Sequence, residues 1–124
     1  MLESKITILC VDDEEIPLML RRMVLEKAGY DVVTAHSAAE ALVIVASRHV
    51  DLVLSDYLMP SLSGTELSRQ IKVNRPSLPV ILFSGVNEVP ADAAYADLFL
   101  SKVVGPVDLC EKIAMVLGNL PLSK

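Results

Sequence analysis

Basic residues are few in this chain, and they do not gather into clusters. Of its 124 residues, 11 are lysine or arginine and 16 are aspartate or glutamate, which gives a formal net charge of −5. A protein that follows a nucleic-acid backbone needs a basic patch to neutralise phosphates, and an anionic membrane surface makes the same demand. The composition therefore argues against direct binding of nucleic acid or of a membrane.

Cysteine and histidine are equally scarce. Cys10 and Cys110 lie in apolar runs, lack metal-ligand spacing and are too few for a disulfide framework, which predicts reduced core cysteines. His36 and His49 have no ligand spacing either, and we interpret them as surface or helix-cap residues. This pattern fits a cytoplasmic protein.

Long apolar segments are also lacking. No apolar run approaches the roughly 20 residues that a membrane-spanning helix needs, and residues 1–5 lack the apolar core of a signal peptide. We expect a soluble protein that is not exported.

The length and composition favour one compact domain. The chain is 52% hydrophobic and 22% charged, and it is long enough for one sizeable core but too short to divide comfortably into two. It contains no repeat and no low-complexity linker. We expect a single domain over residues 1–124, with a core at about 5–118 and no output domain.

Short apolar runs recur along the chain and predict β-strands. The run at 5–11 is almost continuously apolar, which suits a strand buried on both faces. Similar runs occupy 31–35, 51–55, 80–84 and 97–101. Segments of helical character separate them. Five strands and five helices in strict alternation predict an α/β protein with a doubly wound parallel sheet.

Periodicity and end signals support the first and last helices. The first helix places Ile16, Met19, Leu20 and Met23 on one face. It tolerates Pro17 in its first turn, and Gly29 follows its last turn as a C-terminal stop. The fifth helix begins around Pro106, ends at Gly118, and places Cys110, Ile113, Ala114 and Leu117 on one stripe.

Two capping boxes predict where the second and third helices begin. In a capping box a hydroxyl and a carboxylate reciprocally satisfy the free N–H groups of the first turn. The pairs Ser37 with Glu40 and Ser63 with Glu66 match it. Residues 42–45 alone would suggest a strand, and only the preceding cap and the helix length favour helix there.

Polar side chains follow four of the predicted strands. The first strand ends in Asp12 and Asp13, the third in Asp56, the fourth in Ser84 and the fifth in Lys102. The carboxyl ends of parallel strands share one edge of the sheet, where ligands bind. Three carboxylates, a hydroxyl and an ammonium group are therefore expected to converge.

Each of these residues also has a simpler interpretation. Asp13 or Ser84 could cap a helix, Asp56 could belong to a turn, and Lys102 could extend into solvent. The occurrence of three carboxylates at one edge of the sheet is harder to explain, because two carboxylates about 5 Å apart repel by roughly 3 kcal/mol at an effective dielectric constant of about 20. A bound divalent cation removes that penalty. Oxygen ligands of this kind are what Mg²⁺ prefers.

The sequence resembles the receiver domain of response regulators, with similarity to the chemotaxis regulator over about 5–118. The motifs that carry the resemblance are Val11-Asp-Asp-Glu14, Asp56-Tyr-Leu-Met-Pro60, Gly64, Ser84-Gly85 and Phe99-Leu-Ser-Lys102. The resemblance implies a flavodoxin-like fold of five βα units with strand order 2-1-3-4-5. It also implies a role in two-component phosphorelay signalling.

The resemblance further implies a chemistry for the site. Asp56 would attack the phosphorus of a phosphohistidine on a histidine kinase or phosphotransfer protein and become an aspartyl phosphate. Mg²⁺, or Mn²⁺ in its place, would be bound directly by Asp13, Asp56 and the backbone carbonyl of Leu58, and by Asp12 through water. The domain would not be an enzyme acting on other molecules, because it promotes only its own phosphorylation and dephosphorylation.

The remaining residues are assigned by the same resemblance. Lys102 would pair with the phosphoryl oxygens, Ser84 would hydrogen-bond one of them, and Phe99 stands at the position of the family's switch aromatic. The switched surface would be that of the fourth helix, fifth strand and fifth helix. A homodimer formed on phosphorylation is compatible with it. The physics agrees, since phosphoryl transfer needs positioning and charge neutralisation, and an ionised carboxylate is already a nucleophile.

The chain departs from the family pattern after Lys102. Val103 stands where a proline in a cis bond is usual, and a cis bond before valine would cost about 2.5–4 kcal/mol, so a trans bond is expected. The segment between Ser84 and Lys102 is shorter than is common and contains Pro90. We expect its helix to be short or irregular, and the downstream partner cannot be transferred from relatives.

Three other functions compete with that of a phospho-accepting receiver. A phosphatase of the haloacid dehalogenase type needs Asp-x-Asp after the first strand, whereas Asp12 and Asp13 are adjacent. A flavodoxin-like cofactor binder needs a Ser/Thr/Gly-rich loop there, and an acidic loop would repel the cofactor's phosphate. A degenerate receiver that acts only as an interaction module remains, although every charged and hydroxyl position is present.

Overall fold

The chain folds around one parallel β-sheet of five strands. The computed structural model describes residues 5–60, 62–85, 96–101 and 104–118. The strands are β1 (Thr7–Val11), β2 (Asp31–Ala35), β3 (Leu52–Asp56), β4 (Val80–Ser84) and β5 (Leu98–Ser101), in the order β2-β1-β3-β4-β5. All four strand pairs are parallel. The predicted fold class and strand order are confirmed.

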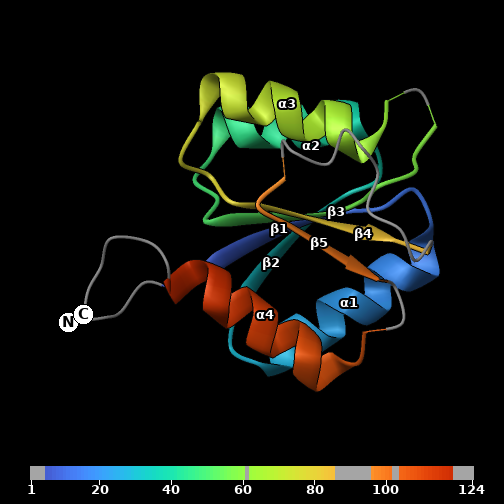
Figure 1. Ribbon diagram of the computed structural model, residues 1–124, viewed down its shortest axis with the longest axis vertical. Coiled ribbons are helices and arrows are strands. Elements are labelled where there is room, and N and C mark those ends of the chain that lie inside the picture. Colours follow the sequence, from blue (N-terminus) through green and yellow to red (C-terminus); the bar gives the residue numbers. More distant parts are fainter. Residues whose placement is uncertain (1–4, 61, 86–95, 102–103, 119–124) are drawn as a thin grey trace.

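Helices cover both faces of the sheet. They are α1 (Glu15–Lys27), α2 (Ala38–Ser47), α3 (Gly64–Asn74) and α4 (Pro106–Gly118). Figure 1 shows α2 and α3 on one face and α1 and α4 on the other. The helix expected between β4 and β5 falls largely on residues 86–95, outside the described residues, so α4 is the helix predicted as the fifth.

Two apolar clusters fill the spaces between the sheet and its helices. Every residue of β1, β3 and β4 is buried, as expected for strands covered on both faces, whereas the edge strands β2 and β5 are partly exposed. One cluster joins the sheet to α1 and α4, and the other joins it to α2 and α3. The sheet is therefore the rigid support on which the strand ends are presented.

The first helix turns a different face to the core than its apolar stripe suggests. Its fully buried residues are Leu18 and Leu25. The predicted stripe of Ile16, Met19, Leu20 and Met23 is 47–65% exposed. Arg21 lies between the two leucines on the inner face. Because this charged residue interrupts the true stripe, the more regular apolar stripe next to it was the stronger signal.

The last helix shows a similar shift. Its buried residues are Leu109, Ile113, Val116 and Leu117, so Ile113 and Leu117 were predicted correctly. Cys110 is only half-buried and Ala114 is exposed. Cys10 is fully buried, as predicted, and both cysteines are free thiols. For Cys110 the expected core position was wrong.

The capping boxes form only in part. The hydroxyls of Ser37 and Ser63 each accept a hydrogen bond from the backbone N–H three residues later, at 3.1 Å, and they cap α2 and α3 as predicted. The reciprocal bond differs. The Glu40 carboxylate accepts the N–H of His36 at 2.7 Å, and the Glu66 carboxylate accepts from side chains further along α3.

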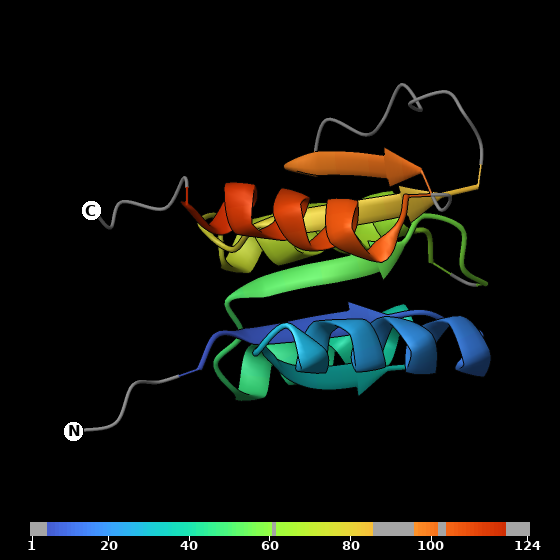
Figure 2. The same ribbon diagram turned by 90° about the horizontal axis from the view of Figure 1, so that it is seen from below.

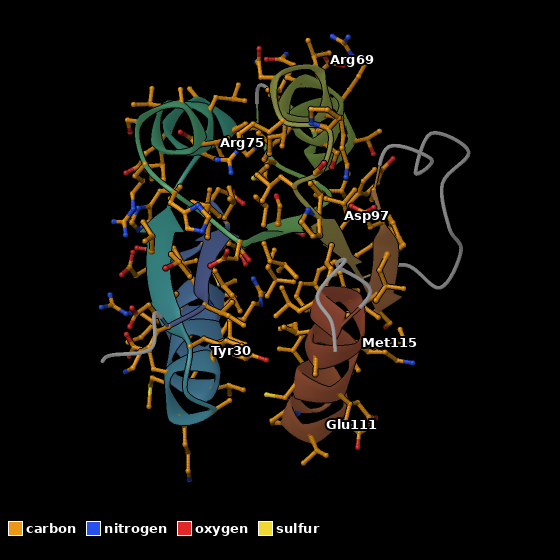
Figure 3. The ribbon with its side chains drawn as sticks, turned by 90° about the vertical axis from the view of Figure 1, so that its left-hand side faces the viewer. Tyr30, Arg69, Arg75, Asp97, Glu111 and Met115 are labelled. Atoms are coloured by element: carbon orange, nitrogen blue, oxygen red, sulfur yellow. The ribbon has the colours of Figure 1, made fainter. Side chains whose placement is uncertain are left out.

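The edge strand β5 is anchored at its start by Asp97. One carboxylate oxygen of Asp97 accepts hydrogen bonds from Lys72 Nζ in α3 and from the N–H of Val80 in β4, both at 2.7 Å. Figure 3 shows Asp97 at the beginning of the strand.

Within the described part of the chain, no helix is both long and apolar enough to cross a membrane.

Candidate functional site at the carboxyl edge of the sheet

Four of the predicted polar residues lie at one edge of the sheet because all five strands point the same way (Figure 2). Asp12 directly follows β1, Asp56 ends β3 and Ser84 ends β4. In the register of the sheet Asp56 is opposite Phe83, and Ser84 is opposite Ser101. The reversal of strand order falls between β1 and β3, which places Asp12 and Asp56 across the crevice where ligands of such sheets bind.

Three carboxylates meet in that crevice. Asp12, Asp13 and Asp56 each offer an oxygen, and the three oxygens lie within 4.8 Å of one another. Asp12 is fully buried and Asp56 is 5% exposed, whereas Asp13 is exposed. The cluster therefore opens to solvent on the Asp13 side. Its oxygen-only donors suit a hard cation such as Mg²⁺, and one cation would offset their mutual repulsion.

Asp12 is held by two donors. Its Oδ1 accepts the N–H of Glu14 at 2.9 Å, and its Oδ2 lies 3.4 Å from Nη1 of Arg21. Glu14, and not Asp13, is the N-cap residue of α1, and it makes no side-chain cap bond. The capping interpretation of Asp13 is therefore wrong, and its carboxylate belongs to the acidic cluster.

The loop after Asp56 is fixed by backbone contacts. The N–H of Tyr57 donates to the carbonyl of Phe83 at 2.7 Å, and the N–H of Gly64 donates to the carbonyl of Tyr57 at 2.7 Å. A Cβ at Gly64 would overlap the carbonyl oxygen of Asp56 and lie 3.0 Å from Leu82 Cδ2. The glycine eight residues past Asp56 is thus required by the close approach of α3 to the loop.

Ser84 and Phe99 occupy the neighbouring strands. Ser84 is 1% exposed, and Phe99 is partly buried. The Phe99 ring meets the ring of Tyr57 edge to face, with centroids 5.7 Å apart and planes inclined at 64°. The aromatic at the predicted switch position therefore contacts the residue that follows Asp56.

Some of the predicted features remain expectations. Lys102, Val103 and the peptide bond between them lie outside the described residues, so the expected trans bond and the reach of the ammonium group stay predictions. Leu58 is 63% exposed, and the role of its carbonyl also stays a prediction.

Two residues of the site were missed from the sequence, namely Arg21 and Tyr57. Arg21 could have been suspected from its spacing of three and four residues from Leu18 and Leu25, which puts it on their side of the helix. Nothing in the sequence signals the ring contact of Tyr57, because it depends on the pairing of β4 with β5.

Comparison with known proteins places the chain in a family. Residues 8–114 match the family model of the response regulator receiver domain, and the chain belongs to this family. The transcriptional regulatory protein PhoP of Bacillus subtilis, which controls alkaline phosphatase synthesis, is 31% identical over 120 residues, or 94% of this chain and 50% of PhoP. The chain spans about half or less of the length of the curated relatives it matches.

Solved structures give the same result. A CheY-like receiver domain protein from Methanospirillum hungatei is 33% identical, with a TM-score of 0.86 over 92% of this chain and 94% of its own. The response regulator TrrA of Thermotoga maritima, solved in complex with Mg²⁺ and BeF, is 31% identical, with a TM-score of 0.82 over 90% of this chain and 98% of its own. The chain is a receiver domain of two-component signalling.

Proposed function

We propose that Asp56 accepts a phosphoryl group from the phosphohistidine of a histidine kinase or phosphotransfer protein. The observation that carries this proposal is the convergence of Asp56 with Asp12 and Asp13 at the switch point of the sheet. Asp56 is the central member, because it ends a fully buried strand between β1 and β4. In the transfer, a carboxylate oxygen of Asp56 forms a bond to phosphorus while the bond from phosphorus to the histidine nitrogen breaks.

The acidic cluster supplies the binding site for Mg²⁺. Asp13 and Asp56 would bind the cation directly together with the carbonyl of Leu58, and Asp12 would act through water. When bound, the cation neutralises charge on the phosphoryl oxygens, which is the main requirement of phosphoryl transfer. Asp56 needs no separate base because its ionised carboxylate is the nucleophile.

The neighbouring strand ends complete the proposed site. Ser84 would donate its hydroxyl to a phosphoryl oxygen, and Lys102 would pair with another. These contacts exist only with the phosphoryl group present, so they can shift a conformational equilibrium. The shift would reach the surface around β5 through the ring pair of Phe99 and Tyr57.

The test is phosphorylation by acetyl phosphate with and without Mg²⁺, followed by intact-mass measurement. Wild type should gain one phosphoryl group in a Mg²⁺-dependent manner, and Asp56→Asn should gain none while keeping its fold. Asp108→Asn makes the same chemical change at an exposed residue in the first turn of α4 that is not a member of the acidic cluster, and it should be phosphorylated like wild type.

The outcomes separate phosphorylation at Asp56 from phosphorylation at another residue and from a degenerate receiver. An adduct that persists on Asp56→Asn would place the acceptor elsewhere. A folded wild type that takes no phosphoryl group under any condition would instead favour an interaction module that works without phosphorylation.

A further inference from the structure

Arg21 occupies a core position of α1. It follows Leu18 by three residues and precedes Leu25 by four, so the three side chains share one face of the helix. The leucines are 2% and 0% exposed, and the side chain of Arg21 is 11% exposed. Arginine is seldom buried so far without a partner, which points to a specific use of its charge.

The guanidinium group of Arg21 contacts a carboxylate and an aromatic ring. Nη1 lies 3.4 Å from Oδ2 of Asp12, and the guanidinium carbon lies 4.5 Å from the centre of the Phe83 ring. Stacking on an aromatic face and pairing with a carboxylate are both favoured by a planar guanidinium, which stays charged at every physiological pH. The helix therefore holds a permanent cation beside the acidic cluster.

Asp12 depends on this cation. Its side chain is fully buried, with Oδ1 bonded to the N–H of Glu14 and Oδ2 facing Arg21. A buried carboxylate that loses its charge partner strongly destabilises a fold. Arg21 therefore compensates one of the three negative charges of the cluster when no other cation is bound.

We propose that Arg21 is a positioning residue that fixes Asp12 and competes with Mg²⁺ for its charge, which weakens Mg²⁺ binding and stabilises the metal-free protein. This inference rests on the proposed function, because the cation site is the one assigned there to phosphoryl transfer. A cation that approaches the cluster meets one carboxylate already neutralised and is repelled by the guanidinium group. The affinity for Mg²⁺ is thereby set by α1 as well as by the three aspartates.

The test is Arg21→Met. Methionine continues the apolar stripe of α1, and a cavity of about 290 Å³ beside Arg21, bordered also by Pro17 and Leu20, gives it room to adapt. By calorimetry the dissociation constant of Mg²⁺ should fall roughly tenfold, the size expected from removing one charge several ångströms from a divalent ion. The metal-free variant should also melt below wild type, and saturating Mg²⁺ should raise its melting temperature more.

Arg22→Met is the matched control. Arg22 is the next residue of the same helix, but its side chain is half exposed and pairs with Glu26 at 3.0 Å. This variant loses the same charge at a site screened by solvent, so its Mg²⁺ affinity should stay within about twofold of wild type. Arg21→Lys keeps the charge and should retain the weaker wild-type affinity. Equal Mg²⁺ affinity in wild type, Arg21→Met and Arg22→Met would overturn the proposal.

A measurement on wild type decides the question even where Arg21→Met does not fold. In the ¹⁵N-labelled protein, Mg²⁺ should move the side-chain Nε–H resonance of Arg21 and leave that of Arg22 in place. An Arg21 resonance indifferent to saturating Mg²⁺ would overturn the inference and leave the proposed function standing. A wild type that binds no Mg²⁺ would instead refute the proposed metal site itself.

Discussion

Gly64 and Asp56 are in direct contact across the loop that joins β3 to α3. The first residue of α3 packs on the backbone that carries the proposed acceptor, and the N–H of Gly64 also donates to the carbonyl of Tyr57. A side chain at position 64 has no space unless the Asp56 backbone or the helix moves. The position of the acceptor carboxylate thus depends on a residue that contributes no chemistry.

Gly64→Ala should therefore affect both stability and phosphorylation. Forcing a methyl group into this contact is expected to lower the free energy of unfolding by about 1–3 kcal/mol, measured by urea denaturation. Phosphorylation by acetyl phosphate should also slow, because Asp56 is displaced. Gly118→Ala is the control, since a Cβ there meets nothing within 4 Å. Equal stability of the two variants would contradict the packing argument.

Cys10 lies two residues before Asp12, and unlike the aspartates of the cluster it stays uncharged. Burial in the apolar core raises the pKa of its thiol to about 12, against the smaller opposing effects of Arg21 and Arg22. The thiol therefore stays neutral and adds no negative charge beneath the acidic cluster.

At the scale of single elements, the first turn of α3 carries a charge network of its own. The Glu66 carboxylate accepts hydrogen bonds from Arg69 and, at 3.0 Å, from Gln70. These bonds lower the pKa of Glu66 from 4.5 to about 2, with Arg69 the largest cause. A lowered pKa in the folded state means that ionised Glu66 stabilises the fold above the unfolded pKa, and that this contribution is lost as pH falls through the folded pKa.

The pH dependence of Glu66→Gln follows from that sign. Wild type should be more stable than the variant near pH 6, and the difference should shrink as the pH falls from 4.5 toward 2. Urea unfolding of both proteins at a series of pH values measures it. A difference that is independent of pH over this window would show that the ionised form of Glu66 makes no contribution.

The strands and the acidic site could be predicted from the sequence because both have local signals. A fully buried parallel strand is a short apolar run, and the polar residue that follows it must lie at the common edge, as Asp12, Asp56 and Ser84 do. The facing of the helices was harder to predict. In α1 the buried stripe contains Arg21, so the apolar period alone selected the wrong face.

The same limit applies to contacts made between elements. The capping hydroxyl of Ser63 was predictable from its spacing to Glu66. The carboxylate of Glu66, however, accepts hydrogen bonds from Arg69 and Gln70 in place of the expected cap bond. The pairing of Tyr57 with Phe99 depends on two strands that are not adjacent in the sheet. Which of these contacts form depends on the partners that the folded structure brings together, and the local sequence does not show them.

On the scale of the whole molecule, the acidic cluster lies at the rim where the two helical layers meet the sheet. Phe83 belongs to the apolar cluster beneath α1 and α4 and contacts Arg21, whereas Tyr57 and Phe99 pack on the cluster beneath α2 and α3. The site around Asp56 is therefore bordered by side chains from both helical layers. The edge strand β5, which carries Phe99, has one buried residue among its four. We expect a signal from Asp56 to reach this strand through Tyr57 and Phe99.

Beryllofluoride bound with Mg²⁺ mimics the phosphoryl group and should change the environment of Ser84, Tyr57 and Phe99. The mimic adds contacts for Ser84 that are absent beforehand, so amide exchange should slow at the ends of β4 and β5 and around Tyr57. Aromatic resonances of Tyr57 and Phe99 should shift with the same dependence on beryllofluoride. Asp56→Asn, which cannot bind the mimic, is the control and should show neither change. Slower exchange confined to the loop after Asp56, with residues 98–101 and the Phe99 ring unaffected, would refute signalling through β5.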